Sequence, residues 1–201
     1  MQIIGSDPTR MIDLPGSGPC PRPVDIDERV TGFSTLKSLR IYTFAKGQMI
    51  DGESEGDEVY VVAIGGAVDM VVSGTHPLHV TLSPGDVQAL YMTPEHAYKL
   101  KPQSHVQVAY ARAQASGHVA SHAVTGTRGD AAETLRFALV NLLAGDVLDQ
   151  HLSGERLIHL IAGTVDVDGT TVNAPQTIAL PMGEIAPVRA RAATQLLVVW
   201  V

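Results

Sequence analysis

The chain has 201 residues, of which 45% are hydrophobic and 17% charged, a composition typical of a globular protein and not of a disordered one. Its 14 basic and 21 acidic residues give a net charge of -7, which argues against nucleic acid or an anionic membrane as a partner, because both bind through clustered Lys and Arg. One cysteine excludes an internal disulfide, and the longest apolar run, residues 59–68, is far shorter than the ~20 residues that cross a bilayer, so we expect a cytoplasmic protein with no membrane partner.

Residues 1–34 are rich in Pro and Asp, and they lack the basic start and apolar stretch of a signal peptide. We expect this segment to form an extended arm that packs over the domain that follows it or over a partner subunit.

Residues 35–112 read as a series of short strands. The run 59–64 is β-branched and aromatic and ends at two glycines, and the run 68–72 follows it. Residues 73–75 and 83–86 have the Ser, Gly, Pro and Asp composition of tight turns. Several short strands between such turns predict a sandwich or a barrel.

Residues 113–129 are rich in Ala, Ser, Gly, Thr and His and lack apolar periodicity, so we expect a linker over residues 113–133. Residues 134–201 return to short apolar runs, with Asp168-Gly169 as a hairpin turn. The segment 130–143 contains good helix formers, and its apolar residues fit either period. We predict a strand over 135–143, because the corresponding segment 39–44 of an internal repeat reads as one.

That repeat organises the whole chain. Gly47 corresponds to Gly145 and Asp51 to Asp149 at an offset of 98, and Glu58 corresponds to Glu155 at an offset of 97. Residues 85–96 then correspond to 175–186 at an offset of 90. Three blocks in the same order, with small changes in offset, predict two copies of one β-rich unit.

Two motifs of the first unit resemble those of the cupin family. In that family two His, separated by one residue, precede a Glu that stands seven positions before a Gly. A second motif runs from a Gly to a His eleven positions later. The matching positions here are Asp51 and Glu53 for the paired His, Glu58 for the Glu, Gly65 for its Gly, and Gly85 with His96 for the second motif.

The resemblance implies an all-β fold of two tandem cupin-type double-stranded β-helix (jelly-roll) barrels. Residues 35–112 form the first predicted barrel and residues 134–201 the second, with 113–133 between them and the arm 1–34 in front. Cupins commonly form dimers, so the resemblance also implies a homodimer.

The resemblance further implies one divalent metal inside the first barrel, because the family's three His and Glu hold one. The candidate ligands are Asp51, Glu53, Glu58 and His96. A set so rich in carboxylates suits manganese, magnesium or iron better than a thiolate-seeking metal, and zinc is the remaining expectation. The alternative interpretation of the same residues is a solvated acidic loop with no metal.

The second unit departs further from the family pattern. Asp149 and His151 match the paired-His positions, and Glu155 or Arg156 matches the Glu, depending on register. Ala186 replaces the last His, so we expect no tightly held metal there. The candidate contacts for a small-molecule ligand in the two barrels are Tyr60, Tyr91, His96, His151 and Arg156.

Three functions follow. The first is a protein that binds a small molecule, such as a sugar acid or another small anion, in a barrel pocket. The second is a divalent-metal-dependent enzyme, an isomerase or dioxygenase-like protein, that uses the acidic site of the first barrel. The third is a structural or regulatory dimerisation module. Residues 89–111 also resemble part of the two-barrel sugar-acid isomerases, whose metal lies in the second barrel.

Overall fold

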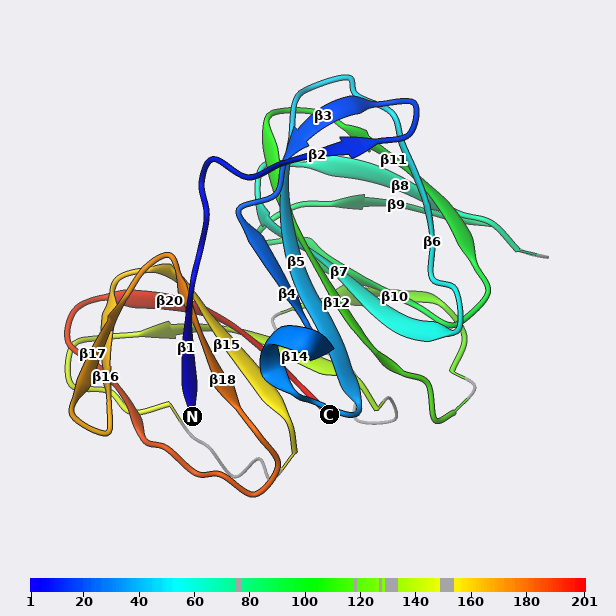
Figure 1. The fold of residues 1–201 in the computed structure, drawn as a ribbon. Helices are drawn as coiled ribbons and strands as arrows, with labels where there is room; N and C mark the ends of the chain where they lie inside the picture. The colour runs from blue at the N-terminus through cyan, green and yellow to red at the C-terminus, as the bar shows by residue number, and fades with distance from the viewer. Residues whose placement is uncertain (75–76, 118, 127, 129–133, 149–153) are drawn as a thin grey trace.

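A computed structural model describes residues 1–74, 77–117, 119–126, 128, 134–148 and 154–201. Two β-barrels lie side by side (Figure 1), which confirms the all-β prediction of two jelly-roll units. The described part of the chain includes no helix with the length and hydrophobicity of a transmembrane span.

The first barrel consists of two facing sheets. The larger has the order β13-β10-β7-β12-β5-β4 and is built from β4 (Val24–Asp27), β5 (Leu36–Phe44), β7 (Asp57–Gly65), β10 (Val87–Met92), β12 (Val106–Gln114) and β13 (His122–Thr125). The smaller has the order β6-β11-β8-β9 and is built from β6 (Ile50–Glu53), β8 (Val68–Val72), β9 (Leu78–Leu82) and β11 (Ala97–Pro102).

The second barrel repeats this plan with fewer strands. Its larger sheet has the order β1-β18-β15-β20-β14, from β1 (Gln2–Gly5), β14 (Arg136–Leu142), β15 (Arg156–Ala162), β18 (Gln176–Leu180) and β20 (Thr194–Trp200). The smaller contains β16 (Thr164–Val167), β17 (Thr170–Asn173) and β19 (Val188–Ala190). The ambiguous segment contains strand β14, which pairs antiparallel with β20 along its whole length, as the repeat predicted.

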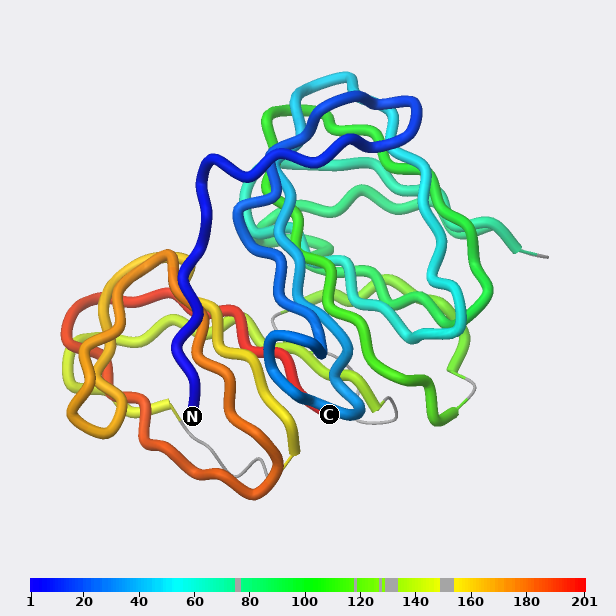
Figure 2. The backbone as a smooth tube through the Cα atoms, viewed as in Figure 1, coloured from blue at the N-terminus to red at the C-terminus, as the bar shows by residue number. Residues whose placement is uncertain are grey.

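The N-terminal segment links the two barrels (Figure 2). Strand β1 pairs with β18 of the second barrel, whereas β4 pairs with β5 of the first. Between them lie the hairpin of β2 (Met11–Leu14) and β3 (Gly18–Pro21), and the single turn α1 (Glu28–Thr31) follows β4. The segment predicted as an arm therefore supplies strands to both barrels, and the segment predicted as a linker supplies β13, which pairs with β10.

Strand periodicity divides the buried side chains among three apolar clusters. On β7, Val59 and Val61 point into the first barrel, whereas Tyr60 and Val62 point toward the second barrel. On β15, Ile158 points into the second barrel, whereas Leu157 faces the first. Two clusters thus fill the barrels, and the third packs between them.

Candidate binding site in the first barrel

The four predicted metal ligands lie on different parts of the first barrel. Asp51 and Glu53 lie on β6 with exposed side chains. Glu58 is only 2% exposed and lies on the face of β7 that packs against the second barrel. His96 precedes β11, and its Nδ1 lies 2.9 Å from the carbonyl oxygen of Pro94.

These residues do not assemble into a metal site. Among the described residues, no group of three or more His, Cys, Asp or Glu is placed so that it could hold a metal ion. The ring of His96 packs near Gly74, and His96 is not among the residues that line the barrel cavity. The described residues therefore do not fit the metal that the cupin resemblance implied.

The register predicted for the motif that contains Glu58 was wrong by one residue. Gly66, not Gly65, has the left-handed backbone, with φ of 77°, and a Cβ there would lie 2.3 Å from the carbonyl oxygen of His105. Counting seven residues back from Gly66 gives Val59, which does point into the barrel. Because successive strand residues face opposite sides, the shift of one residue turns Glu58 outward.

The same correction applies to the second barrel. Gly163 has φ of 90°, and counting seven residues back from it gives Arg156, not Glu155. Arg156 is fully buried and donates to the carbonyl oxygen of Glu184. Ala186 is also fully buried, in the apolar cluster that fills this barrel. Asp149 and His151, two further predicted site residues, lie outside the described residues.

Glu155 instead connects the two barrels. Its carboxylate accepts hydrogen bonds from the backbone N–H groups of Ser34, Thr35 and Leu36 at 2.6, 2.8 and 2.7 Å, and from the Ser34 hydroxyl at 3.0 Å. Burial alone would raise the pKa of this carboxyl, but the donors outweigh burial and lower the pKa below its usual value. Glu155 therefore acts as a clamp on the start of β5.

The predicted ligand contacts Tyr60 and Tyr91 also lie between the barrels and not in a barrel cavity. Their ring centroids are 5.4 Å apart, and Tyr60 lies 4.8 Å from the ring of Phe137 in the second barrel. The Tyr91 hydroxyl donates to Glu58 at 3.2 Å, and burial together with the Glu58 charge raises the pKa of Tyr91. These tyrosines pack the inter-barrel core.

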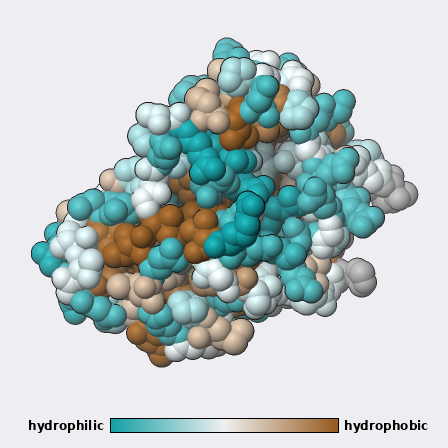
Figure 3. Space-filling model, viewed as in Figure 1, coloured by the Kyte–Doolittle hydropathy of each residue, from teal (hydrophilic) through white to brown (hydrophobic). Residues whose placement is uncertain are grey.

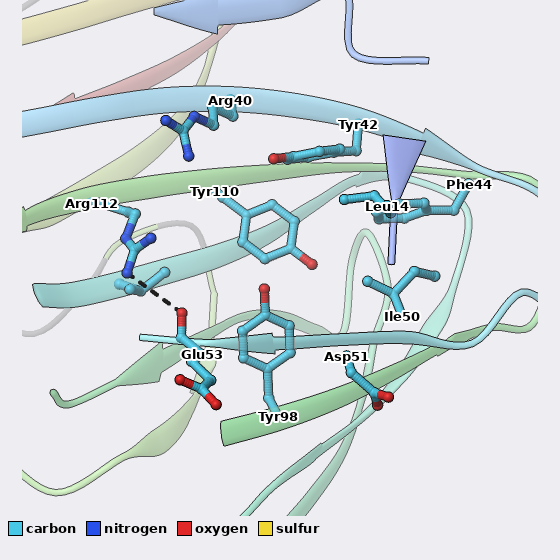
Figure 4. Close-up of a pocket in the computed structure, with 11 residues that line it drawn as sticks. Leu14, Arg40, Tyr42, Phe44, Ile50, Asp51, Glu53, Tyr98, Tyr110 and Arg112 are labelled. Carbon is cyan, nitrogen blue, oxygen red and sulfur yellow. Dashed lines mark hydrogen bonds between the residues drawn. The ribbon is translucent and has the colours of Figure 1, made fainter. Parts of the chain in front are cut away.

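A different set of side chains forms a cavity of about 80 Å³ in the first barrel (Figure 4). The larger sheet contributes alternate residues of β5 and β12, and β6 and β11 close the opposite side. The lining residues are Leu14, Arg40, Tyr42, Phe44, Ile50, Asp51, Glu53, Val59, Tyr98, Tyr110 and Arg112.

Aromatic rings form one wall of this cavity. Phe44 stacks on Tyr42 with centroids 5.5 Å apart, Tyr42 meets the ring of Tyr110 edge-on at 5.3 Å, and Tyr110 stacks on Tyr98 at 6.0 Å. The Tyr98 ring lies against Gly52, where a Cβ would lie 2.4 Å from it. The row thus depends on a glycine at that position.

The tyrosine hydroxyls are buried polar groups. Figure 4 shows the hydroxyls of Tyr98 and Tyr110 pointing toward one another, and the Tyr110 hydroxyl has no hydrogen-bond partner within the described chain. Burial raises the pKa of Tyr98 to about 12 and that of Tyr110 well above its usual value. Both phenols therefore stay protonated at neutral pH and can each donate a hydrogen bond to a ligand.

Two arginines lie at one end of the cavity (Figure 4). Arg112 is held by Asp57 at 3.3 Å, by Glu55 at 3.2 Å and by the carbonyl oxygen of Ser54. Arg40 is held more loosely, through its Nε at 3.3 Å from Asp25, and its terminal nitrogens bond to no other described residue.

Asp25 also pairs with two other guanidinium groups. Arg10 and Arg22 lie 2.8 and 2.9 Å from it. Arg10, Arg22 and Arg40 therefore share the carboxylate of Asp25, and Arg40 is the one that lines the cavity. These four side chains together carry an excess of positive charge in a protein whose net charge is -7.

Sequence reasoning named Asp51 and Glu53, which do line the cavity, but it missed the arginines and most of the aromatic wall. The signal was available in strand parity. Residues 106, 108, 110 and 112 alternate with smaller or exposed residues along β12, and they point into the barrel as a set.

No protein-family model and no curated protein sequence matches this chain. Solved structures do resemble it. The nickel(II) complex of the bacterial pirin YhhW from Escherichia coli is 12% identical, with a TM-score of 0.73 and coverage of 100% of this chain and 98% of that one. A Cupin 2 conserved barrel domain protein from Leptotrichia buccalis is 16% identical, with a TM-score of 0.57 and coverage of 100% and 96%.

The quercetin 2,3-dioxygenase of Acinetobacter baumannii is 15% identical, with a TM-score of 0.72 and coverage of 99% and 85%. Identities this low show the fold alone, and that fold is the cupin fold predicted from the motifs. The likeness to sugar-acid isomerases stays a prediction.

Proposed function

We propose that this protein binds a small hydroxy acid in the cavity of its first barrel. The observation that carries the proposal is the position of Arg40, whose terminal nitrogens are available beside a row of tyrosines. A guanidinium recognises a carboxylate through paired N–H donors, and the excess positive charge around Asp25 favours an anion.

The acidic residues of the same cavity favour hydroxyl groups on that anion. Asp51 and Glu53 are hydrogen-bond acceptors, so they repel a second carboxylate but accept from an alcohol. The phenols of Tyr98 and Tyr110 add groups that both donate and accept. A molecule with one carboxylate and one or more hydroxyls satisfies both ends of the cavity.

The size of the cavity favours a ligand of few atoms. Its volume of about 80 Å³ is roughly half of the ~150 Å³ that holds benzene in an engineered protein core. A three-carbon acid fits this space, whereas the ring of a sugar acid must extend through the opening.

Calorimetric titration with three molecules of similar size tests the proposal. We expect glycerate to bind at least about tenfold more tightly than propionate, which lacks the hydroxyls, or glycerol, which lacks the charge. Glucuronate measures whether a sugar acid is accepted as well. Equal binding of glycerate and glycerol would contradict the role assigned to arginine.

Two variants that each remove one positive charge complete the experiment. Arg40→Gln is expected to weaken glycerate binding about tenfold, and Arg191→Gln, which removes a half-exposed arginine of the second barrel, to leave it unchanged. If both variants bind like the parent protein, the cavity is not the site.

The alternative is a divalent-metal-dependent enzyme. The nickel(II) bound by the pirin of similar fold supports a metal in such a barrel, but the described residues of this chain do not present a ligand set for one. Metal analysis after dialysis against manganese, iron, nickel or zinc separates the two functions. Stoichiometric metal that is lost on His96→Ala would favour the enzyme.

A further inference from the structure

A second and larger cavity lies where the two barrels meet. Its volume is about 490 Å³, within the range of small-molecule pockets, which often occur at domain interfaces. The first barrel contributes Ile41 of β5 and Ile64 of β7, and the second contributes Ile161 of β15 and Pro175 before β18. We call it the inter-barrel cavity.

Segments from both barrels hold its rim in place. Residues 6–8 of the N-terminal segment cross from one barrel to the other (Figure 2). The Ser6 hydroxyl donates to the carbonyl oxygen of Pro175 at 2.5 Å, and the N–H of Asp7 donates to the carbonyl oxygen of Pro23 at 2.8 Å. The cavity is therefore formed before any ligand arrives.

The lining is mostly apolar and its polar groups are uncharged. Proline and aliphatic side chains dominate, and Ser6, Thr43 and Gln107 are polar but neutral. No Asp, Glu, Lys or Arg belongs to the described lining. Figure 3 shows apolar residues gathered on the viewed face over the second barrel, beside its junction with the first. A charged ligand finds no partner in such a site.

One buried ring supplies a polar anchor. His159 of β15 lines the cavity and is only 4% exposed. Its Nδ1 lies 3.0 Å from the hydroxyl of Thr177, a residue that is 1% exposed, whereas its Nε2 has no hydrogen-bond partner in the described chain. Burial also lowers the pKa of His159 to about 4, so the ring is neutral at pH 7.

We propose that the inter-barrel cavity binds a neutral, largely apolar small molecule whose single hydroxyl group meets Nε2 of His159. The hydroxyl suits the ring in either tautomer, because a neutral imidazole offers one donor and one acceptor and a hydroxyl is both. This site is separate from the first-barrel cavity and asks for the opposite ligand chemistry, since it lacks the arginines that select an acid there.

Titration followed by NMR tests the inference with three molecules of the same shape. p-Cresol is expected to give saturable shifts at the amides of Ile41, Ile64 and Ile161 and at the imidazole nitrogens of His159. p-Toluate, which replaces the hydroxyl by a carboxylate, and toluene, which has neither group, are expected to bind at least threefold more weakly.

Matched variants identify the anchor. His159→Leu is expected to weaken p-cresol binding three- to tenfold, the effect of one hydrogen bond, while glycerate binding to the first barrel is unchanged. His105→Leu, at an exposed position, serves as the control. Thr177→Val keeps the ring and removes only its partner at Nδ1, so it provides a second test if His159→Leu does not fold.

Several results would overturn the inference. The first is the absence of saturable shifts at these residues up to the solubility limit of p-cresol. The second is p-toluate binding as well as p-cresol. The third is a concentration-dependent dimer whose formation abolishes the p-cresol shifts, which would assign the cavity to an interface between two copies of the chain.

Discussion

The two barrels place a buried glutamate at equivalent positions of the repeat and surround it differently. Glu58 and Glu155 are 2% and 5% exposed, and each faces the other barrel. Glu155 accepts four hydrogen bonds from residues 34–36. Glu58 accepts one, from Tyr91, and its Oε1 has no partner within the described chain. Equivalent position therefore does not mean equivalent contribution to stability.

The residues that follow the two glutamates, Val59 and Arg156, also differ in chemistry. Val59 of the first barrel pairs across the sheet with Arg112, and Arg156 of the second barrel pairs with Trp200. Each pair joins one arginine to one apolar residue, but on opposite strands. In the first barrel the arginine borders a cavity, whereas in the second it is buried at 0% exposure. The arginine of the first barrel is therefore reached from a cavity, whereas the arginine of the second barrel is enclosed by the protein.

The comparison of the two glutamates predicts the largest effect on stability. Glu155→Gln is expected to lower the free energy of unfolding at pH 7 by about 3–5 kcal/mol, because the amide turns donors toward buried N–H groups. Glu58→Gln is expected to change it by less than about 1 kcal/mol, because the glutamine still accepts from Tyr91. Urea unfolding measures the free energy of unfolding of both variants. Equal losses of stability would contradict the stabilising role assigned to the hydrogen bonds of Glu155.

The same unfolding experiment at low pH tests whether the stabilisation by Glu155 depends on the charge of its carboxylate. The pKa of Glu155 is lowered in the folded state, so its contribution is complete above the unfolded value near 4.5 and is lost as the pH falls through the folded value. The gap in stability between the parent protein and Glu155→Gln should therefore narrow at pH 3.

The interior of the second barrel provides the next prediction. Arg156→Ala is expected to cost about 3 kcal/mol, because it empties the volume of a fully buried side chain. Arg156→Met keeps most of that volume and removes a buried charge, so its cost should stay below about 1.5 kcal/mol. If Met costs as much as Ala, the polar contacts of the guanidinium, and not its volume, stabilise the barrel.

Sequence reasoning reached the fold through glycines and strand patterns, which are local signals. The duplication, the strand of β14 and the turn at Asp168 and Gly169 all follow from them. The site did not follow, because Gly65 and Gly66 are adjacent and only the backbone conformation tells which one ends the strand. The choice between these two glycines decides whether Glu58 or Val59 is predicted to point into the first barrel; in the second barrel the count from Gly163 leads to Arg156.

The contacts of Arg40 could not be predicted from sequence patterns, for a different reason. Its partner Asp25 belongs to β4, and Asp25 in turn binds Arg10, which precedes β2. Ion pairs between strands that are distant in the chain depend on how the N-terminal segment wraps the barrel, and no periodicity encodes that path.

The pH dependence of stability tests the buried histidine at the junction of the barrels. His159 is neutral when folded, with a pKa of about 4 against 6.5 for the exposed ring, so the unfolded chain binds the extra proton between these values. Stability is expected to be complete above pH 6.5 and to fall by up to about 3 kcal/mol as the pH drops toward 4. His159→Gln should flatten this part of the curve, and His105→Gln should not; a slope unchanged by His159→Gln would contradict the buried, neutral ring.

The smallest expected effect on stability is the one that separates binding from folding in the first barrel. Tyr110→Phe removes a buried hydroxyl that has no hydrogen-bond partner in the described chain, so the free energy of unfolding should change by less than about 0.5 kcal/mol, or rise. If that hydroxyl faces a hydroxy acid, the same variant should bind glycerate several-fold more weakly. Loss of affinity at constant stability would mean that the unpaired phenol serves the ligand, whereas a drop in stability with unchanged affinity would mean that Tyr98 is its partner in solution and that the cavity wall is closed.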